Sequence, residues 1–226
     1  MVERSYRGLL WTLVLLGTTL DQVSKYGVFK WLYHDGEGGQ QVIVPRVFKL
    51  LAQFTGVPET GASFLAALRS GSGPILPKVN HGALFGLGGE RETLPHAIFA
   101  GLGAWIGLDA ARMANMVFAA ISLLAVLAII YWSTRGSTAS DGCLCAALGL
   151  ILAGTLGNLY DRVVFNGVRD FLYFHWFEFP VFNIADSCLV CGAFLLLIQA
   201  FWNRPAAASS HEKNEAAMSS AAAQQG

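Results

Sequence analysis

Charged side chains inside apolar segments are the residues of this sequence that could do chemistry, because a charge at the bilayer centre costs at least about 2.5–3.5 kcal/mol. Asp186 opens an apolar segment and has no cation near it in the sequence. Asp170 precedes the same segment beside Arg169, so alone it could be an ordinary loop acid. Two carboxyl groups in a poorly hydrated pocket can share one proton, so that one activates water while the other hydrogen-bonds the carbonyl under attack. Asp170 and Asp186 are therefore candidates for an aspartic hydrolase pair.

Two other groups of polar residues lie inside apolar segments. Asp21 and Lys25 are spaced i, i+4 with the acid first, the favourable order for a salt bridge on one helical face. Asn158, Asp161 and Arg162 also share one face of a helix by their spacing. Asp161 is expected to pair with its neighbour Arg162. Both groups are interpreted either as structural ion pairs or as supports for an adjacent site.

The composition favours a membrane protein. Hydrophobic residues make up 54% of the 226 residues and charged residues only 13%, whereas an ordinary soluble domain carries about 25% charged residues. The formal net charge of zero provides no basic field for nucleic acid. There is no His-Glu-x-x-His run, the histidines are scattered, and the cysteines fall at different predicted depths. We therefore expect no metal, no cofactor and no nucleic-acid partner.

Four apolar segments each approach the length of about 20 residues that a helix needs to cross a bilayer. They cover residues 8–29, 113–132, 142–160 and 182–201. The predicted fold class is therefore an all-α polytopic membrane protein with one membrane-embedded domain at 1–204. Gly154 and Gly157 in the third segment are expected to let a neighbouring helix approach closely. The tail at 205–226, rich in Ala, Ser and Gln, is predicted to be disordered.

An even number of spans places both termini on one side of the membrane. Arg4, Arg7, Arg135 and Arg204 predict that this side is cytoplasmic. The loops at 30–112 and 163–181 then lie outside, and Asp170 and Asp186 lie at that outer face.

The two outer loops are predicted to carry structure of their own. In the first, residues 42–44 and 47–48 are predicted as short strands of a small β-rich cradle. Residues 94–108 are predicted to form an interfacial helix, since the stretch is short for a span. The second loop is rich in aromatic residues, which is typical of the membrane–water boundary.

Five short motifs occur in order along this four-span profile. They are Leu20-Asp21-Gln22-Val23-Ser24-Lys25, Asn80-His81-Gly82-Ala83-Leu84-Phe85-Gly86, Gly157-Asn158-Leu159-Tyr160-Asp161-Arg162, Gly167-Val168-Arg169-Asp170-Phe171 and Phe182-Asn183-Ile184-Ala185-Asp186-Ser187. In this arrangement the chain resembles the lipoprotein signal peptidases (signal peptidase II), a family of membrane aspartyl proteases.

The resemblance implies a site and a reaction. It implies that Asp170 and Asp186 are the catalytic pair, although Asp161 could otherwise have been paired with Asp186. The implied reaction is hydrolysis of the peptide bond just before a diacylglyceryl-modified cysteine, which releases the signal peptide of a prolipoprotein. The expected enzyme is a monomer in the lipid of the bacterial cytoplasmic (inner) membrane. The residues implied to support the pair and bind the substrate are Asp21, Lys25, Asn80, Gly82, Asn158, Asp161, Arg162 and Asn183.

The chain also departs from the family pattern. Residues 52–77 and 88–112 look like insertions, and Lys78-Val79 stand before Asn80 where the family usually has an arginine. The main alternative from another class is a small proton- or ion-coupled transporter subunit. A transporter predicts acids at staggered depths and an internal repeat, and neither is visible in the sequence. A scaffold that only binds lipoprotein precursors is disfavoured because both acids are present.

Overall fold

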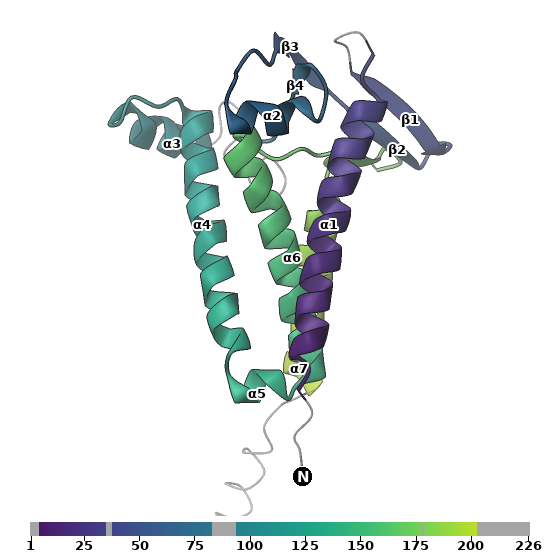
Figure 1. Cartoon of the computed structure of the whole chain (residues 1–226), viewed down its shortest axis with the longest axis vertical. Helices are drawn as coiled ribbons and strands as arrows, with labels where there is room; N and C mark the ends of the chain where they lie inside the picture. The colour runs from purple at the N-terminus through teal and green to yellow at the C-terminus, as the bar shows by residue number, and fades with distance from the viewer. Residues whose placement is uncertain (1–4, 35–37, 83–93, 178, 203–226) are drawn as a thin grey trace, which may run out of the picture.

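The computed structural model describes residues 5–34, 38–82, 94–177 and 179–202. Long helices run side by side along one axis (Figure 1), namely α1 (Arg7–Trp31), α4 (Ala110–Ser133), α6 (Gly142–Phe165) and α7 (Ile184–Trp202). The remaining elements are β1 (Gly39–Val44), β2 (Phe48–Ala52), β3 (Phe54–Pro58), α2 (Phe64–Ser70), β4 (Ile75–Pro77), α3 (Leu94–Ala104), α5 (Gly136–Ala139) and β5 (Leu172–Phe174). The strands, α2 and α3 gather at one end of the helices, the sheet end, while α5 and the start of α1 mark the opposite, α5 end.

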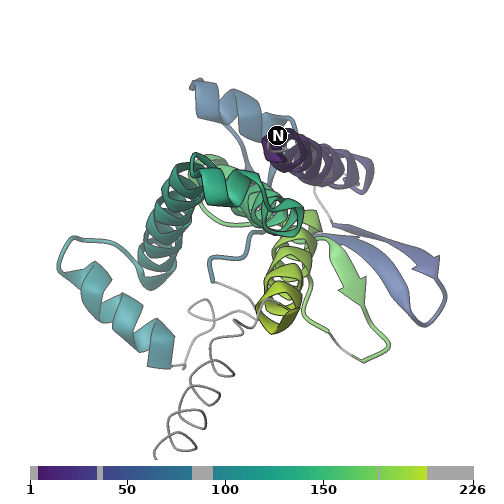
Figure 2. The same ribbon diagram turned by 90° about the horizontal axis from the view of Figure 1, so that it is seen from below.

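α6 is the central helix of the bundle. It packs against α1, α4 and α7, and the view along the bundle shows it among them (Figure 2). A Cβ atom at Gly154 would collide with the backbone oxygen of Ala185 in α7, and one at Gly157 would lie 2.5 Å from the Asp21 carboxylate of α1. The prediction that these two glycines allow close helix approach is confirmed.

The outward surface of the bundle is apolar. α4, α6 and α7 are each long and apolar enough to cross a membrane. Leu124 of α4 and Leu197 of α7 are among many large hydrophobic side chains that remain exposed, as expected for helices that face lipid. The helical character is thus confirmed, and three of the predicted spans coincide with helices that are long and apolar enough to cross a membrane.

α1 differs from the other long helices. Its 25 residues are long enough to span a bilayer, but Asp21 and Lys25 in its interior lower its mean hydropathy. Both side chains lie on the buried face that packs on α6, and Leu15 and Leu20 point outward. Because the charges face the bundle and the leucines do not, the exposed surface of α1 is still apolar.

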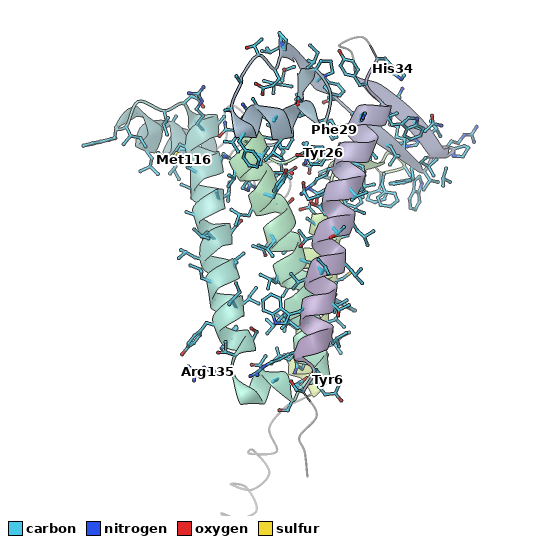
Figure 3. The ribbon with its side chains drawn as sticks, in the orientation of Figure 1. Tyr6, Tyr26, Phe29, His34, Met116 and Arg135 are labelled. Carbon is cyan, nitrogen blue, oxygen red and sulfur yellow. The ribbon has the colours of Figure 1, made fainter. Side chains whose placement is uncertain are left out.

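Contacts at the α5 end tie the chain together. The Arg7 side chain donates to the carbonyl oxygens of Ser133 (3.1 Å) and Thr134 (2.6 Å), which end α4. The Tyr6 N–H donates to Ala139 of α5 at 2.7 Å. Figure 3 shows Tyr6 at this end and Tyr26 at the other. The start of α1 is thereby placed beside the connection between α4 and α6.

Two small sheets cover the sheet end. One has the strand order β1-β2-β5 and the other pairs β3 with β4, all antiparallel. β1 and β2 form a hairpin whose turn contains Arg46 at a φ of 64°. Strands therefore occur at residues 42–44 and at Phe48, while Val47 lies in the turn. Because β5 begins two residues after Asp170, the three-stranded sheet connects the first loop to the segment that carries this acid.

Several boundaries differ from the sequence predictions. α4 begins at Ala110 rather than 113, and the helix predicted at 94–108 covers Leu94–Ala104. α6 runs to Phe165 rather than 160, because the residue that ends it is Asn166, in the left-handed region at a φ of 58°. The predicted disorder at 205–226, like Arg4 and Arg204, lies outside the described residues.

Candidate active site

A cavity of about 500 Å³ opens at the sheet end between α4, α6, α7 and the segment from β5 to α7. Asp170 and Asp186 both line it. Its polar lining also includes Asn80, Asn158 and Arg162. Most of the remaining wall is apolar: Phe118, Ile121, Val168, Phe174, Phe177, Phe179, Pro180, Val181, Phe182, Leu189 and Val190. The two candidate acids therefore face the same largely apolar space.

Asp186 is fixed by the first turn of α7. Its Oδ2 accepts from the Asn183 N–H at 3.1 Å, and Asn183 Oδ1 accepts from the Asp186 N–H at 3.0 Å. This reciprocal arrangement is a capping box, which satisfies N–H groups at a helix start. Asp186 Oδ1 accepts from Asn158 Nδ2 at 2.8 Å. Two donors to the carboxylate and the positive end of the helix dipole thus favour a fixed, negatively charged side chain.

Asp170 lies in an extended segment between α6 and β5. Its Oδ1 accepts from Asn183 Nδ2 at 2.7 Å and its Oδ2 from Asn80 Nδ2 at 3.1 Å. The backbone of Asn80 pairs with Val168 through two hydrogen bonds of 2.8 Å. Asp170 is therefore held by amide side chains from both sides. Asn183 hydrogen-bonds to Asp170 and to Asp186, so it links the two acids.

The electrostatic surroundings of Asp170 favour its protonated form. Burial, and then the negative charge of Asp186, raise the pKa of Asp170 to about 7, although the amides of Asn80 and Asn183 and the charge of Lys25 act in the opposite direction. An acid with a pKa near neutrality can hold or release a proton at physiological pH. Asp170 therefore has the property expected of the protonated partner of an acid pair.

Behind the cavity lies a second cluster of polar groups, formed by Asp21, Lys25, Asp161 and Arg169, which we call the closed cluster. All four side chains are fully buried. Lys25 Nζ lies 2.8 Å from Asp21 Oδ2 and 3.4 Å from Asp161 Oδ2. Asp161 Oδ1 accepts from Arg169 Nη2 at 2.8 Å. Two acids and two bases thus neutralise one another out of contact with solvent.

The closed cluster corrects one sequence prediction and confirms another. Asp161 pairs with Arg169 and Lys25 rather than with Arg162, because Arg162 points to the cavity side of α6. The predicted i, i+4 salt bridge between Asp21 and Lys25 is present. Asp161 does not line the cavity, whereas Asn158 on the same helix does.

Asn158 connects the closed cluster to the cavity. Lys25 Nζ donates to its Oδ1 at 3.2 Å, and its Nδ2 donates to Asp186 at 2.8 Å. Asn183 Nδ2 also donates to Asn158 Oδ1, at 3.2 Å. Two donors on the oxygen fix which way the amide points, so its N–H groups face Asp186.

Arg162 brings a positive charge to the cavity. Its Nη2 donates to the Gly82 carbonyl at 2.7 Å, and its guanidinium lies 5.2 Å from the ring centre of Phe118. Gly82 is in turn held by its N–H, which donates to Asn80 Oδ1 at 2.9 Å. Arg162 and the segment at 80–82 are therefore positioned by each other beside the two acids.

Several residues that hold this arrangement are not among those predicted from the sequence. Asn115 of α4 is buried and donates to the Arg162 carbonyl (3.1 Å) and to Asn166 Oδ1 (3.0 Å). Gln22 donates to Asp21 and to the Gly157 carbonyl. Ser72 accepts from Arg169. A neutral polar residue near the start of an apolar helix was a usable signal for Asn115, but nothing local marked Ser72.

Comparison with family models and known proteins gives a consistent result. The model of the family described as signal peptidase (SPase) II matches residues 75–202. A lipoprotein signal peptidase from Rhodopirellula baltica is 44% identical over 115 residues, which cover 44% of this chain and 50% of that protein. One from Pseudomonas aeruginosa is 35% identical over 106 residues, covering 46% and 62% respectively. The chain thus spans 50–62% of the length of these two relatives.

Solved structures agree on the fold. A bacterial membrane enzyme determined by the in meso method at 2.3 Å resolution superposes with a TM-score of 0.61 at 20% identity, covering 91% of this chain and 97% of that one. A second, at 1.9 Å, has a TM-score of 0.59 at 22% identity and covers 91% and 99%. The transporter interpretation receives no support from these comparisons.

Proposed function

This chain belongs to the signal peptidase II family, and from that membership and the cavity geometry we propose that it is an aspartic endopeptidase of prolipoproteins. It hydrolyses the peptide bond just before a diacylglyceryl-modified cysteine and releases the signal peptide. Asp170 and Asp186 form its catalytic pair. The reaction uses water as the nucleophile and needs no metal and no cofactor.

One observation carries this proposal. Asn183 donates to Asp170 at 2.7 Å through its side chain and to Asp186 at 3.1 Å through its backbone. Two acids from separate segments are thereby brought to one amide and to one cavity. Carboxyl groups with such a shared, partly dry environment titrate as a pair that holds a single proton.

The environments of the two acids suggest their roles. Asp186 is the ionised partner, because the Asn183 N–H at the start of α7 and the Asn158 amide donate to its carboxylate. It removes a proton from water as the water oxygen bonds to the carbonyl carbon. Asp170, whose pKa is raised to about 7, holds the proton and hydrogen-bonds the carbonyl oxygen. As the tetrahedral intermediate collapses and the C–N bond breaks, a proton passes to the departing amine.

The cavity lining fits a substrate that is part peptide and part lipid. Arg162 and the amides of Asn80 and Asn158 provide donors for peptide carbonyls beside the acids. The apolar wall continues along α4 and α7 through Ile121 and Val190, toward surfaces that we place in lipid. Acyl chains on the cysteine can therefore remain in an apolar environment while the peptide bond reaches the acids. All of these groups come from one chain, so we propose that a monomer suffices.

Exposed residues support a placement in the membrane. We propose that α1, α4, α6 and α7 all span the inner membrane, with the α5 end and both termini in the cytoplasm. Exposed tryptophans suit the two membrane–water boundaries. They are Trp11 and Trp132 toward the α5 end, and Trp31, Trp105 and Trp176 toward the sheet end.

At the outer boundary, the small elements support the substrate. We propose that the sheet β1-β2-β5 forms a cradle beside the cavity and that α3 lies in the interface. Ile98, Leu102 and Trp105 in and after α3 are more than half exposed. Aromatic rings of the β5–α7 segment pack on one another: Phe174 stacks on both Phe177 and Phe182. These rings cover one side of the cavity.

Cleavage of a defined precursor by the purified protein tests the proposal. The substrate is a synthetic prolipoprotein peptide with a diacylglyceryl cysteine, compared with the same peptide unlipidated. We expect cleavage before the cysteine in the lipidated peptide only, unaffected by a chelator. Equal cleavage of both peptides would show that the lipid is not required. Inhibition by the chelator would indicate a metal. Cleavage of neither peptide would refute the assigned reaction.

A further inference from the structure

Ser72 is a fully buried hydroxyl that the mechanism does not use. It lies between α2 and β4, in a part of the chain that precedes the family-model match at 75–202. Its Oγ accepts a hydrogen bond of 2.7 Å from Arg169 Nη1. A segment outside the matched region therefore contacts the residue next to Asp170.

The segment β3-α2-β4 is built to hold Ser72 in place. The Ser63 side chain caps the start of α2. Just after the end of α2, the Ser72 N–H donates to the Arg69 carbonyl at 3.0 Å. Arg69 forms an ion pair with Glu59 of the same segment and donates to the Val164 carbonyl of α6 at 3.1 Å. Gly73, at a φ of 135°, then turns the chain into β4. The turn is thus attached to α6 as well as closed on itself.

Arg169 is enclosed on every side. Its guanidinium lies 3.8 Å from the ring centre of Phe165 and 4.2 Å from that of Tyr26. Nε and Nη2 donate to Asp161, and Nη2 also to Gln22 Oε1 at 3.0 Å. Nη1 is left for Ser72. In this dry setting a lost acceptor leaves a charged donor unsatisfied, which is costly.

Arg169 and Asp170 are consecutive residues of an extended segment. Successive side chains of such a segment point in opposite directions, which is why Arg169 enters the closed cluster while Asp170 faces the cavity. The Arg169 backbone is also held, because its N–H donates to Asp161 Oδ2 at 2.9 Å. Asp161 thus holds both the side chain and the backbone of Arg169, so we expect a shift of the side chain to be transmitted through this carboxylate to the backbone next to Asp170.

We propose that Ser72 is a positioning residue for Asp170: by accepting from Arg169 Nη1, it fixes Arg169 and thereby the orientation of Asp170 toward Asp186. This inference rests on the proposed function where it is tested by enzyme kinetics. It does not rest on that function where it is tested by NMR titration of Asp170. It gives the β3-α2-β4 segment a role in catalysis although no atom of Ser72 lines the cavity.

The test compares Ser72→Ala with Ser70→Ala. Ser70 is on the same turn, and its exposed hydroxyl donates to the Ala67 carbonyl instead (2.8 Å), so its variant is a matched control. For Ser72→Ala we expect kcat to fall roughly ten- to hundredfold with KM unchanged, since small misplacements of a reacting group have effects of this size. Ser72→Cys keeps the side-chain shape with a weak acceptor and should behave like Ser72→Ala.

The second readout is the titration of Asp170 by carbon-13 carboxyl NMR, assigned with Asp170→Asn. The charged groups around Asp170 are Asp186 from α7, Lys25 from α1 and Arg162 from α6. They are unchanged in Ser72→Ala, so a displaced, better hydrated Asp170 should titrate at lower pH, and the alkaline limb of the activity profile should shift with it. Ser70→Ala should leave both at their original values.

Three outcomes would overturn the inference. The first is that Ser72→Ala has the kinetics and the Asp170 titration of the wild type. The second is that Ser72→Ala loses activity by the same factor at every pH while the titration midpoint of Asp170 is unchanged. The third is that Ser72→Cys behaves like the wild type. Failure of the proposed function looks different. The wild type would then cleave nothing, while a shifted Asp170 midpoint in Ser72→Ala would still support the positioning role.

Discussion

The two polar clusters at the sheet end each contain a pair of aspartates, and the two pairs have different surroundings. In the closed cluster, Asp21 and Asp161 face Lys25 and Arg169 at 2.8–3.4 Å, and all four are fully buried. In the cavity, Asp170 and Asp186 are hydrogen-bonded mainly by neutral amides. Matched charges make one cluster a structural core. In the cavity, by contrast, the two acids face amides, the positive charge of Arg162 and open space, and such an acid pair is available for chemistry.

The comparison shows why a buried charge alone is weak evidence of function. A buried ion pair can be replaced by apolar residues without loss of stability, whereas removing one partner is strongly destabilising. Asp161 and Asp170 are close in the sequence, yet Asp161 is fully buried and only the partly exposed Asp170 lines the cavity. Variants of each should therefore fail in different ways.

The largest effect should come from removing either cavity acid. Asp170→Asn and Asp186→Asn should each reduce cleavage of the lipidated peptide at least about 10³-fold, because an amide cannot share or transfer the proton. Asparagine keeps the shape, so both variants should remain folded in membranes. The measurement is peptide cleavage by liquid chromatography, with thermal unfolding as the control. Near-normal turnover by either variant would remove that residue from the pair.

Breaking the closed cluster should act on stability first. Asp161→Asn leaves Arg169 and Lys25 with one acid between them, so we expect a loss of about 3–5 kcal/mol in unfolding free energy. Urea unfolding in detergent micelles measures it. If Asp161→Asn were inactive but as stable as the wild type, Asp161 would belong with the catalytic acids. The two clusters would then not differ in role.

A smaller effect concerns pH and stability. The folded pKa of Asp170, about 7, lies above the ordinary value of about 3.9 in an unfolded chain. The folded state therefore binds this proton more tightly, so its stabilising contribution is complete below pH 4 and is lost as the pH rises through 7. Asp170→Asn lacks this loss and should melt roughly 5 °C above the wild type at pH 8. At pH 5 the gap should narrow, and a constant gap would contradict the raised pKa.

The smallest effect is expected at an exposed pair. Asp109 and Arg112 lie 3.5 Å apart with side chains 61% and 63% exposed. Asp109→Asn keeps the oxygen that accepts from the Arg112 N–H at the start of α4. Its melting temperature should match that of the wild type, because solvent screens such pairs. A loss of stability as large as that expected for Asp161→Asn would mean that burial does not explain the difference between the exposed pair and the closed cluster.

Much of the site could be predicted because the motifs are local. The i, i+4 spacing of Asp21 and Lys25 was enough to predict their salt bridge, which the structure contains. The strands at 42–44 followed from β-branched residues beside Pro45. The three most apolar spans followed from length and hydropathy.

The partners of Arg169 and Asp161 could not be predicted in the same way. Their pairing depends on an extended segment that turns its side chains to opposite sides, and on an α6 that continues past residue 160 to Asn166. Ser72 reaches Arg169 across 97 residues of sequence. Such contacts depend on how whole helices and strands pack against one another. The spacing of residues within one motif does not predict that packing.

The Asp21 carboxylate also accepts from the Ala185 N–H at 2.9 Å, so a residue of α1 caps α7. Ribosomes make α1 long before α7, and until α7 arrives this carboxylate lacks the helix start that it later holds. The segment that carries Asp186 is likewise made last among the described helices. A nascent chain therefore lacks both Asp186 and the contact that anchors the start of α7 until this last described helix has joined the first.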